Sequence, residues 1–236
     1  PILSGGARLL QWKPFERNIL QADLDQIGTG ANPKDLFFNG ARQVPARIPN
    51  LDRDNPLYGG WAFMQGPSGP DAFTYAKGLI PRPLSKPEQT VVRHFVGPNG
   101  GWGSQMLTVT SIDFDQRIIH TAYADGAHPL LGFNANCRFI IENAIEALDQ
   151  PGEWCVDAKD RKVYFWPPSE LGATSEVVVP ALSTLLRFSH ASWITVTGFT
   201  FTETPAGGGD SVRCEDRDHI QLIGNRFVGS GSRALG

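Results

Sequence analysis

The chain has 236 residues, a formal net charge of −3 and a pI near 6.0, so it has no surplus of basic residues with which to neutralise a nucleic acid backbone. No apolar run approaches the roughly 20 residues that cross a membrane. The 26 glycines and 18 prolines favour many turns and few long helices. We therefore expect an all-β protein that binds neither nucleic acid nor membrane.

The first 24 residues read as short strands that are interrupted by Gly5-Gly6 and by Pro14. Further along, Asn39-Gly40 lies between two apolar segments, and this dipeptide suits the two positive φ angles of a type I′ turn. Residues 50–103 are rich in glycine, proline and aromatic residues, which is typical of long packed loops on a β scaffold. The segment MLTVTSIDF, residues 106–114, predicts another strand.

The stretch NAIEALDQPGEWCVDAKDRKVYFWPP, residues 143–168, predicts a short helix that runs into a β-hairpin. Apolar residues at helical spacing define the helix, and Pro151-Gly152 ends it. These helix residues are Ile140, Ile141, Ala144, Ile145 and Leu148. The carboxylates of this region would lie on different faces, so we expect them to be solvated or to cap the backbone. They are Glu142, Glu146, Asp149, Glu153 and Asp157.

The last quarter of the chain contains an internal repeat. Residues 185–201, LLRFSHASWITVTGFTF, align without a gap on residues 211–227, SVRCEDRDHIQLIGNRF, so that Ile194 falls on Ile220. A fixed period of this size with short strands and glycine corners is typical of a stacked solenoid. We predict a right-handed parallel β-helix in which equivalent residues form rows along the axis.

Three segments together resemble a known group of proteins: LSGGARLLQW at 3–12, LFFNGARQVPARIPN at 36–50, and ENAIEALDQPGEWCVDAKDRKVYFWPP at 142–168. They are similar to parallel β-helix carbohydrate-active enzymes with an inserted β-domain, as in glycoside hydrolase families 120 and 141. The resemblance implies an N-terminal β-helix rung at residues 1–28 and an inserted β-rich, sandwich-like domain at 29–170. Residues 171–236 would then form β-helix coils.

This resemblance implies a glycoside hydrolase that acts on a plant or algal polysaccharide or oligosaccharide. Such enzymes use paired carboxylates, one to protonate the leaving oxygen and one to attack the anomeric carbon or to activate water. The repeat shows only two coils and ends at GSGSRALG, so we expect a fragment of a longer enzyme that can lack the catalytic coils. We expect the uncapped end to self-associate or to pair with absent sequence.

Glu203 and Asp210 flank the loop TPAGGG and are the candidate catalytic pair, although carboxylates at coil corners commonly bond to turn backbone or face water. Trp61 and Trp102 each follow two glycines and are candidates for stacking on a sugar ring, with core packing as the alternative. Two further candidates for substrate binding are Arg47 and His94, for which no spacing argument exists.

We expect neither a resident metal nor another cofactor in a hydrolase. The three cysteines, Cys137, Cys155 and Cys214, form no CxxC or Cys/His cluster and are expected to be free buried thiols. A polysaccharide-acting enzyme is expected to be secreted or periplasmic, and the alternative is a cytoplasmic enzyme that handles imported oligosaccharides.

Two other functions remain open from the sequence. A β-helix polysaccharide lyase or epimerase that acts on uronic acids would need a base and a charge neutraliser, either Ca²⁺ or an arginine such as Arg187 or Arg213. A carbohydrate-binding β-helix fragment without catalytic residues would use the aromatic side chains alone. Arg187 and Arg213 support the lyase only if neither pairs with an acid.

Overall fold

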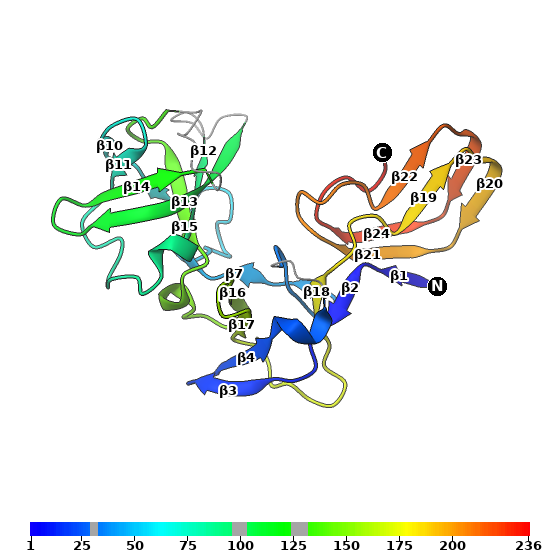
Figure 1. Cartoon of the computed structure of the whole chain (residues 1–236), viewed down its shortest axis with the longest axis horizontal. Coiled ribbons are helices and arrows are strands. Elements are labelled where there is room, and N and C mark those ends of the chain that lie inside the picture. Colours follow the sequence, from blue (N-terminus) through cyan, green and yellow to red (C-terminus); the bar gives the residue numbers. More distant parts are fainter. Residues whose placement is uncertain (29–32, 96–102, 124–131) are drawn as a thin grey trace. The chain divides into compact units, whose positions relative to one another are not determined.

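The computed structural model describes residues 1–28, 33–95, 103–123 and 132–236, and it confirms the all-β class (Figure 1). Within these residues the only helical turns are three short 3₁₀ segments, η1 (Leu24–Ile27), η2 (Pro87–Gln89) and η3 (Ile145–Ala147). The chain divides into two compact units. Unit 1 comprises residues 1–43, 159–163 and 167–236, and unit 2 comprises 44–158 and 164–166. The domain ranges 1–28, 29–170 and 171–236 stay a prediction.

Unit 1 contains three ladders of parallel strands that reproduce the sequence repeat. Strand β19 (Leu186–Ser189) pairs with β22 (Val212–Glu215), β20 (Ser192–Thr197) with β23 (Asp218–Ile223), and β21 (Thr200–Thr204) with β24 (Arg226–Ser230). Ile194 lies opposite Ile220, as the alignment predicts. The inward side chains stack into a core in which Phe201 is fully buried and its ring stacks on Phe227 at 5.0 Å between centroids.

The N-terminal segment joins this arrangement only in part. Strand β1 (Ile2–Ser4) pairs in parallel with β21, which places Leu3 beside Phe201. After β1 the chain leaves the ladder, because β2 (Gly6–Arg8) pairs with β18 (Val177–Pro180) and β3 (Lys13–Glu16) forms a hairpin with β4 (Ile19–Asp23). Of these N-terminal strands, only β1 thus pairs with the parallel ladder of β21 and β24. Gly5-Gly6 marks the point where the chain changes sheet.

The predicted hairpin at Asn39-Gly40 is confirmed. Strands β5 (Phe37–Phe38) and β6 (Ala41–Arg42) pair antiparallel, with φ angles of 50° at Asn39 and 76° at Gly40. Strand β5 also pairs with β18, so the sheet runs in the order β2-β18-β5-β6. This sheet anchors one side of the pocket described below.

Unit 2 is built on a sheet of eight antiparallel strands within the described residues. The order is β10 (Gly66–Pro67), β11 (Ala72–Thr74), β14 (Ile118–Ala122), β13 (Ser104–Asp113), β12 (Val91–Phe95), β15 (Arg138–Glu142) and β8 (Arg47–Ile48), and β9 (Ala62–Phe63) also pairs with β15. The strand predicted at 106–114 is confirmed as β13. The core includes Phe73 and Phe139, whose rings lie 4.8 Å apart.

The helix predicted at residues 140–148 is wrong. Strand β15 runs to Glu142, and only the 3₁₀ turn η3 follows it. Phe139, Ile140 and Ile141 are all buried, because β15 lies inside the sheet and is covered on both faces. A strand buried on both sides has consecutive apolar residues, which together with Ala144, Ile145 and Leu148 imitate helical spacing.

The hairpin predicted after Gly152 is confirmed. Strand β16 (Glu153–Asp157) is followed by β17 (Lys162–Phe165), and the backbone N–H of Trp166 donates to the carbonyl of Glu153 at 2.9 Å. The N–H of Gly152 donates in turn to the carbonyl of Trp166 at 2.7 Å. Strand β7 (Val44–Pro45) pairs in parallel with β16.

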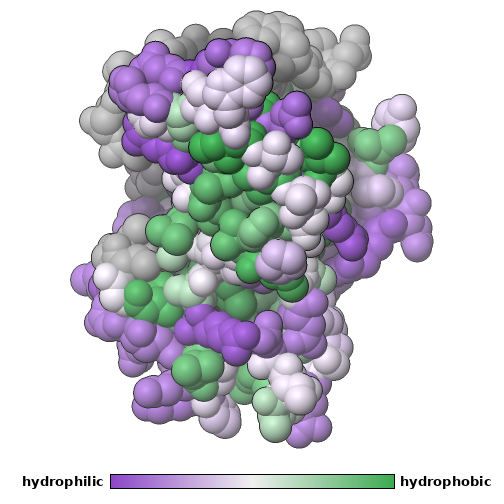
Figure 2. Space-filling model, turned by 90° about the vertical axis from the view of Figure 1, so that its right-hand side faces the viewer, coloured by the Kyte–Doolittle hydropathy of each residue, from purple (hydrophilic) through white to green (hydrophobic). Residues whose placement is uncertain are grey.

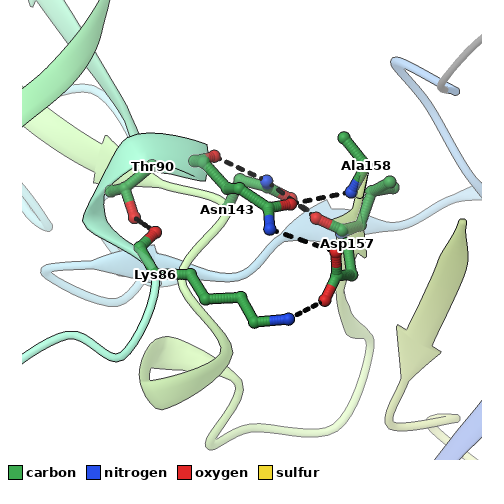
Figure 3. A network of polar contacts seen from close by, with 7 residues as sticks. Lys86, Thr90, Asn143, Asp157 and Ala158 are labelled. Carbon is green, nitrogen blue, oxygen red and sulfur yellow. Dashed lines mark hydrogen bonds and ion pairs between the residues drawn. The ribbon is translucent and has the colours of Figure 1, made fainter. Parts of the chain in front are cut away.

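Asn143 ties three segments of unit 2 together (Figure 3). Its amide nitrogen donates to the carbonyls of Gln89 at 2.8 Å and Val156 at 3.0 Å, and its amide oxygen accepts from the N–H of Val156 at 2.7 Å. Next to it, Lys86 forms an ion pair with Asp157, which also accepts from Gln89 at 3.0 Å. Asn143 has a φ of 65° in this arrangement, a conformation that asparagine adopts more readily than most residues.

The carboxylates of residues 142–157 bind backbone N–H groups, as expected for capping residues, or form ion pairs and a hydrogen bond to an amide, which the sequence did not predict. Glu153 accepts from the N–H groups of Asp149 and Gln150, both at 3.1 Å. The other contacts are Glu142 with Arg93, Glu146 with the N–H of Ser85, Asp149 with Asn50, and Asp157 with Lys86. The acidic residues of this motif therefore have structural roles.

Unit 1 exposes apolar side chains on the outer surface of its parallel ladders. Figure 2 looks from the side on which β20 and β23 lie in Figure 1, and hydrophobic side chains gather across the middle of that face. Trp193 of β20 and Ile223 of β23 are 76% and 54% exposed. The ring of Trp193 stacks on His219 at 3.8 Å, so the repeat also aligns outward side chains.

We predict that Asn143→Ala lowers the free energy of unfolding by about 3 kcal/mol, because it leaves buried backbone groups without partners. It also places alanine at a left-handed φ. Urea denaturation at constant pH measures the change. Asn143→Gly should be less destabilising than Asn143→Ala, because glycine also loses the hydrogen bonds but adopts the left-handed φ without strain. The matched control is Asn50→Ala, which removes one exposed hydrogen bond to Asp149. Equal decreases in the free energy of unfolding for Asn143→Ala and Asn50→Ala would contradict a stabilising role of the Asn143 hydrogen bonds.

We predict that Glu153 makes the stability of the protein depend on pH. Burial raises the pKa of Glu153 from 4.5 to about 7, although the two backbone N–H donors oppose this shift. Between these two values the folded state holds a proton that the unfolded state has released. The contribution of Glu153 to stability is therefore complete below about pH 4.5 and is lost as the pH rises through 7.

We expect the free energy of unfolding to fall by about 3 kcal/mol through this titration, and the fall should be absent in Glu153→Gln, which has no carboxyl group at this position. Urea denaturation of both proteins between pH 4.5 and 8 gives the difference at each pH. Titration of other groups, such as His94, cancels in that difference. Parallel stability curves for the two proteins would show that Glu153 does not hold its proton in the folded state.

Candidate functional site

The candidate site is a pocket of about 690 Å³ in unit 1. Its floor consists of outward side chains from β1, β21 and β24, and its wall comes from β2, β18 and the β5–β6 turn. The floor residues are Ile2, Ser4, Thr200, Thr202, Glu203, Arg226 and Val228, and the wall residues are Gly6, Arg8, Asn39, Gly40, Glu176 and Val178. Glu203 is one of the two catalytic candidates from the sequence.

Parallel pairing in register puts the floor residues in two rows. Ile2 lies beside Thr200, which lies beside Arg226. Ser4 lies beside Thr202 in the second row. Alternate residues of a strand point to opposite faces, so both rows face outward while Phe201 between them faces the core. The repeat that builds the core thus also builds a regular polar floor.

Glu203 reaches this floor because the strand is irregular at that point. Its φ is 59°, and the equivalent residue of the paired strand β24, Gly229, has a φ of 66°. Regular alternation would point residue 203 inward beside Phe201, but the left-handed backbone turns its side chain toward the pocket. Glycine adopts this conformation freely, whereas a non-glycine residue costs about 1–2 kcal/mol there. Strain of this kind is concentrated at functional sites.

The segment Ser4-Gly5-Gly6 holds the Glu203 side chain. The hydroxyl of Ser4 donates a short hydrogen bond to Oε2 of Glu203, and the N–H of Gly6 donates to the same hydroxyl at 3.0 Å. A Cβ atom at Gly6 would lie 1.9 Å from Val178 and 3.1 Å from Glu203 Oε2, and one at Gly5 would lie 2.8 Å from the Glu203 carbonyl. Glycine is therefore required where β1 and β2 pass Glu203.

A second carboxylate and two guanidinium groups share the pocket with Glu203. Glu176 forms an ion pair with Arg8, and its backbone N–H donates to Asn39 at 2.8 Å. Arg226 is exposed at the start of β24. Glycosidic bond hydrolysis uses a pair of carboxyl groups, and Glu176 and Glu203 line the same pocket.

Asp210, the other catalytic candidate, does not line this pocket. Its carboxylate is buried and forms an ion pair with Nε of Arg233 at 2.9 Å. The described structure therefore does not bring Glu203 and Asp210 together in one pocket. A catalytic role of Asp210 stays a prediction.

The substrate-binding candidates belong to unit 2. Arg47 is buried and donates to the backbone carbonyls of Pro49 and Gly60, and burial lowers the pKa of its guanidinium. The Trp61 ring lies against the guanidinium groups of Arg47 and Arg138, at 5.2 and 4.8 Å from its centroid. These contacts fix Trp61 within a cation–π cluster. Sugar contact by either residue stays a prediction.

His94 lies in the core of unit 2 and is fully buried. Its Nδ1 atom is 3.0 Å from Nε2 of Gln105, and Oε1 of Gln105 accepts a hydrogen bond from the hydroxyl of Tyr123 at 2.7 Å. Burial lowers the pKa of His94 to about 4, so the ring is neutral at neutral pH. Contact between its ring and a sugar would require the core to open. Trp102 lies outside the described residues.

The two arginines that favoured a lyase are paired with an acid. Arg187 and Arg213 both contact Glu215, with an Nε to oxygen distance of 2.7 Å from Arg213. The hydrogen bond from Arg187 lowers the pKa of the Glu215 carboxyl. Neither guanidinium is thus available to neutralise a uronate, and the support for a lyase falls away.

The described residues contain no group of three His, Cys, Asp or Glu side chains that could hold a metal ion. All three cysteines are buried free thiols. No helix among the described elements has the length and apolar character needed to cross a bilayer.

Sequence reasoning missed Ser4, Arg8, Glu176 and Arg226 as members of the pocket. One signal was present for Glu203: extending the 26-residue offset past the aligned segments places it opposite Gly229. A glycine at the equivalent position of the repeat indicates a left-handed corner there. The convergence of Ser4 with Glu203, 199 residues apart, had no such signal.

Comparisons with known proteins agree with this architecture. Residues 121–168 match the family model of the GH141 insertion domain. A solved structure described as "Glycoside hydrolase" has a similar fold, with a TM-score of 0.65 and 20% sequence identity, over 95% of this chain and 49% of that one. This chain thus spans about half the length of that protein. No curated protein matches the chain. The resemblance to carbohydrate-active enzymes of glycoside hydrolase family 141 is confirmed through this insertion-domain segment.

Proposed function

We propose that this chain is a glycoside hydrolase with a parallel β-helix and an inserted β-rich domain, and that it hydrolyses a plant or algal polysaccharide or its oligosaccharides. The pocket of unit 1 is the proposed sugar site, and Glu203 is the residue that acts on the glycosidic bond. The single observation that carries this proposal is the buried Glu203 carboxylate, held by Ser4 in a left-handed backbone corner of an open polar pocket.

The chemistry requires two carboxyl groups. One protonates the leaving oxygen while the other attacks the anomeric carbon or takes a proton from the attacking water. Ser4 occupies Oε2 of Glu203, and no described residue donates a hydrogen bond to Oε1. Oε1 is therefore the atom proposed to face the substrate. Glu176 is the proposed second carboxyl group, because it lines the same pocket.

The rest of the pocket suits a sugar. Thr200, Thr202 and Asn39 offer hydroxyl and amide groups to sugar hydroxyls, and Ile2 and Val228 offer apolar surface to the C–H face of a pyranose. A pocket of about 690 Å³ is within the range that holds small ligands. These features support carbohydrate binding independently of the catalytic assignment.

Replacing Glu203 tests the proposal. We expect Glu203→Gln to lower hydrolysis at least about 100-fold, because an amide keeps the shape and still accepts from Ser4 but cannot transfer a proton or attack. Release of reducing ends from a panel of plant and algal polysaccharides and oligosaccharides gives the rate. Thermal unfolding of each variant shows whether the fold is kept.

Two further variants identify the second carboxylate. Glu176→Gln should also lower the rate at least about 100-fold, whereas Asp210→Asn should do so only if Asp210 acts with Glu203. Asp218→Asn, which changes an exposed acid of β23, is the matched control and should leave the rate unchanged. A folded Glu203→Gln protein with wild-type activity would refute the catalytic role of Glu203. Sugar binding with no hydrolysis by the wild type would favour a carbohydrate-binding protein.

A further inference from the structure

We infer that the unit 1 pocket selects an acidic sugar, a pyranose that carries a carboxylate or a sulfate ester, and that Arg226 binds this anionic group. The inference rests on the proposed function, since it names the substrate class of the same site. It concerns a residue that takes no part in breaking the glycosidic bond, so it can be tested separately.

Arg226 is placed by the repeat on the floor of the pocket. It is the first residue of β24 and stands beside Thr200 in the row that starts at Ile2. Its side chain is exposed and lines the pocket that Glu203 also lines. A ligand that reaches Glu203 from solvent can therefore contact both groups.

The acidic side chains that line the pocket do not form an ion pair with Arg226. Arg8 is paired with Glu176, and the carboxylate of Glu203 is engaged by Ser4. Among the residues that the structure describes, no Asp or Glu forms an ion pair with Arg226. Two other arginines of unit 1, Arg187 and Arg213, are by contrast both paired with Glu215. The pocket thus has one cation for which the ligand can supply the partner.

A guanidinium group selects planar or tetrahedral oxyanions. Its fork of N–H donors matches a carboxylate or a sulfate with two parallel hydrogen bonds, and such charge-assisted bonds are about twice as strong as neutral ones. A neutral sugar would offer Arg226 only hydroxyl groups. The two sources of the anion, a uronic acid and a sulfate ester, share this chemistry and differ in the group that bears it.

The test measures affinity rather than turnover, in the Glu203→Gln protein, so that bound sugars are not hydrolysed. Calorimetric titration compares oligomers of galacturonic, glucuronic, mannuronic and guluronic acid with their methyl esters, which are the same sugars without charge. We expect at least one oligouronide to bind about 10- to 100-fold more tightly than its ester. A series of sulfated galactan oligosaccharides and their desulfated forms provides the other arm. A preference for the charged form in one arm identifies the source.

Variants at Arg226 connect this preference to the residue. Arg226→Gln should remove the preference for the charged sugar, and Arg226→Lys should keep part of it, because lysine retains the charge and loses the fork. Arg17→Gln removes one positive charge from an exposed turn outside the pocket and should leave the preference intact.

Equal affinity for charged and neutral forms, with no effect of Arg226→Gln, would overturn the inference and leave hydrolysis by Glu203 standing. The reverse result is also informative. An acid preference that depends on Arg226, in a protein whose wild type hydrolyses none of these sugars, would support the inference and refute the proposed hydrolase. No binding of any charged or neutral oligosaccharide would overturn the inference as well.

Discussion

The parallel pairing of strands at a constant offset of 26 residues is the constraint on which unit 1 depends. This pairing places equivalent positions of the repeat side by side. The same register that stacks Phe201 on Phe227 in the core therefore also places Thr200 beside Arg226 on the outside. A shift of one residue would turn the core side chains outward and the polar floor inward. Burial of the aromatic core therefore fixes the geometry of the pocket.

The left-handed corner at the end of β21 is where this regular pattern is broken. The corner recurs at Gly229, where it costs nothing, and at Glu203, where it is strained. Packing does not require a carboxylate at that point, since glycine fits the backbone better. The surrounding structure instead accommodates Glu203, with Ser4 as donor and with two glycines that leave room for the backbone to pass. Such an arrangement is expected where chemistry, rather than stability, determines the residue.

The sequence predicts some parts of this molecule well, and the reasons are physical. The repeat and the Asn39-Gly40 hairpin are local or periodic features, so residue type alone encodes them. The sequence of strand β15 resembles that of a helix, because a strand covered on both faces shows no alternation of apolar and polar residues. The ring contacts of Trp61 and the burial of His94 could not be predicted, since both depend on distant strands of the sheet in unit 2. The pocket was only partly predictable, because Ser4, Glu176 and Glu203 meet through tertiary structure.

Unit 2 illustrates why a specific motif need not be catalytic. In the segment 142–168, which carries the resemblance, the polar side chains of Asn143, Glu153 and Asp157 bind backbone groups or a lysine. The reactive groups are instead proposed to lie on the ladders of unit 1, where parallel strands in register present side chains in rows.

The most direct measurement for this account is a crystal structure of the Glu203→Gln protein with a bound oligosaccharide. The account predicts that a sugar occupies the unit 1 pocket with its glycosidic oxygen or anomeric carbon within about 3.5 Å of the residue 203 amide. A sugar bound elsewhere, with residue 203 turned away from it, would contradict the account.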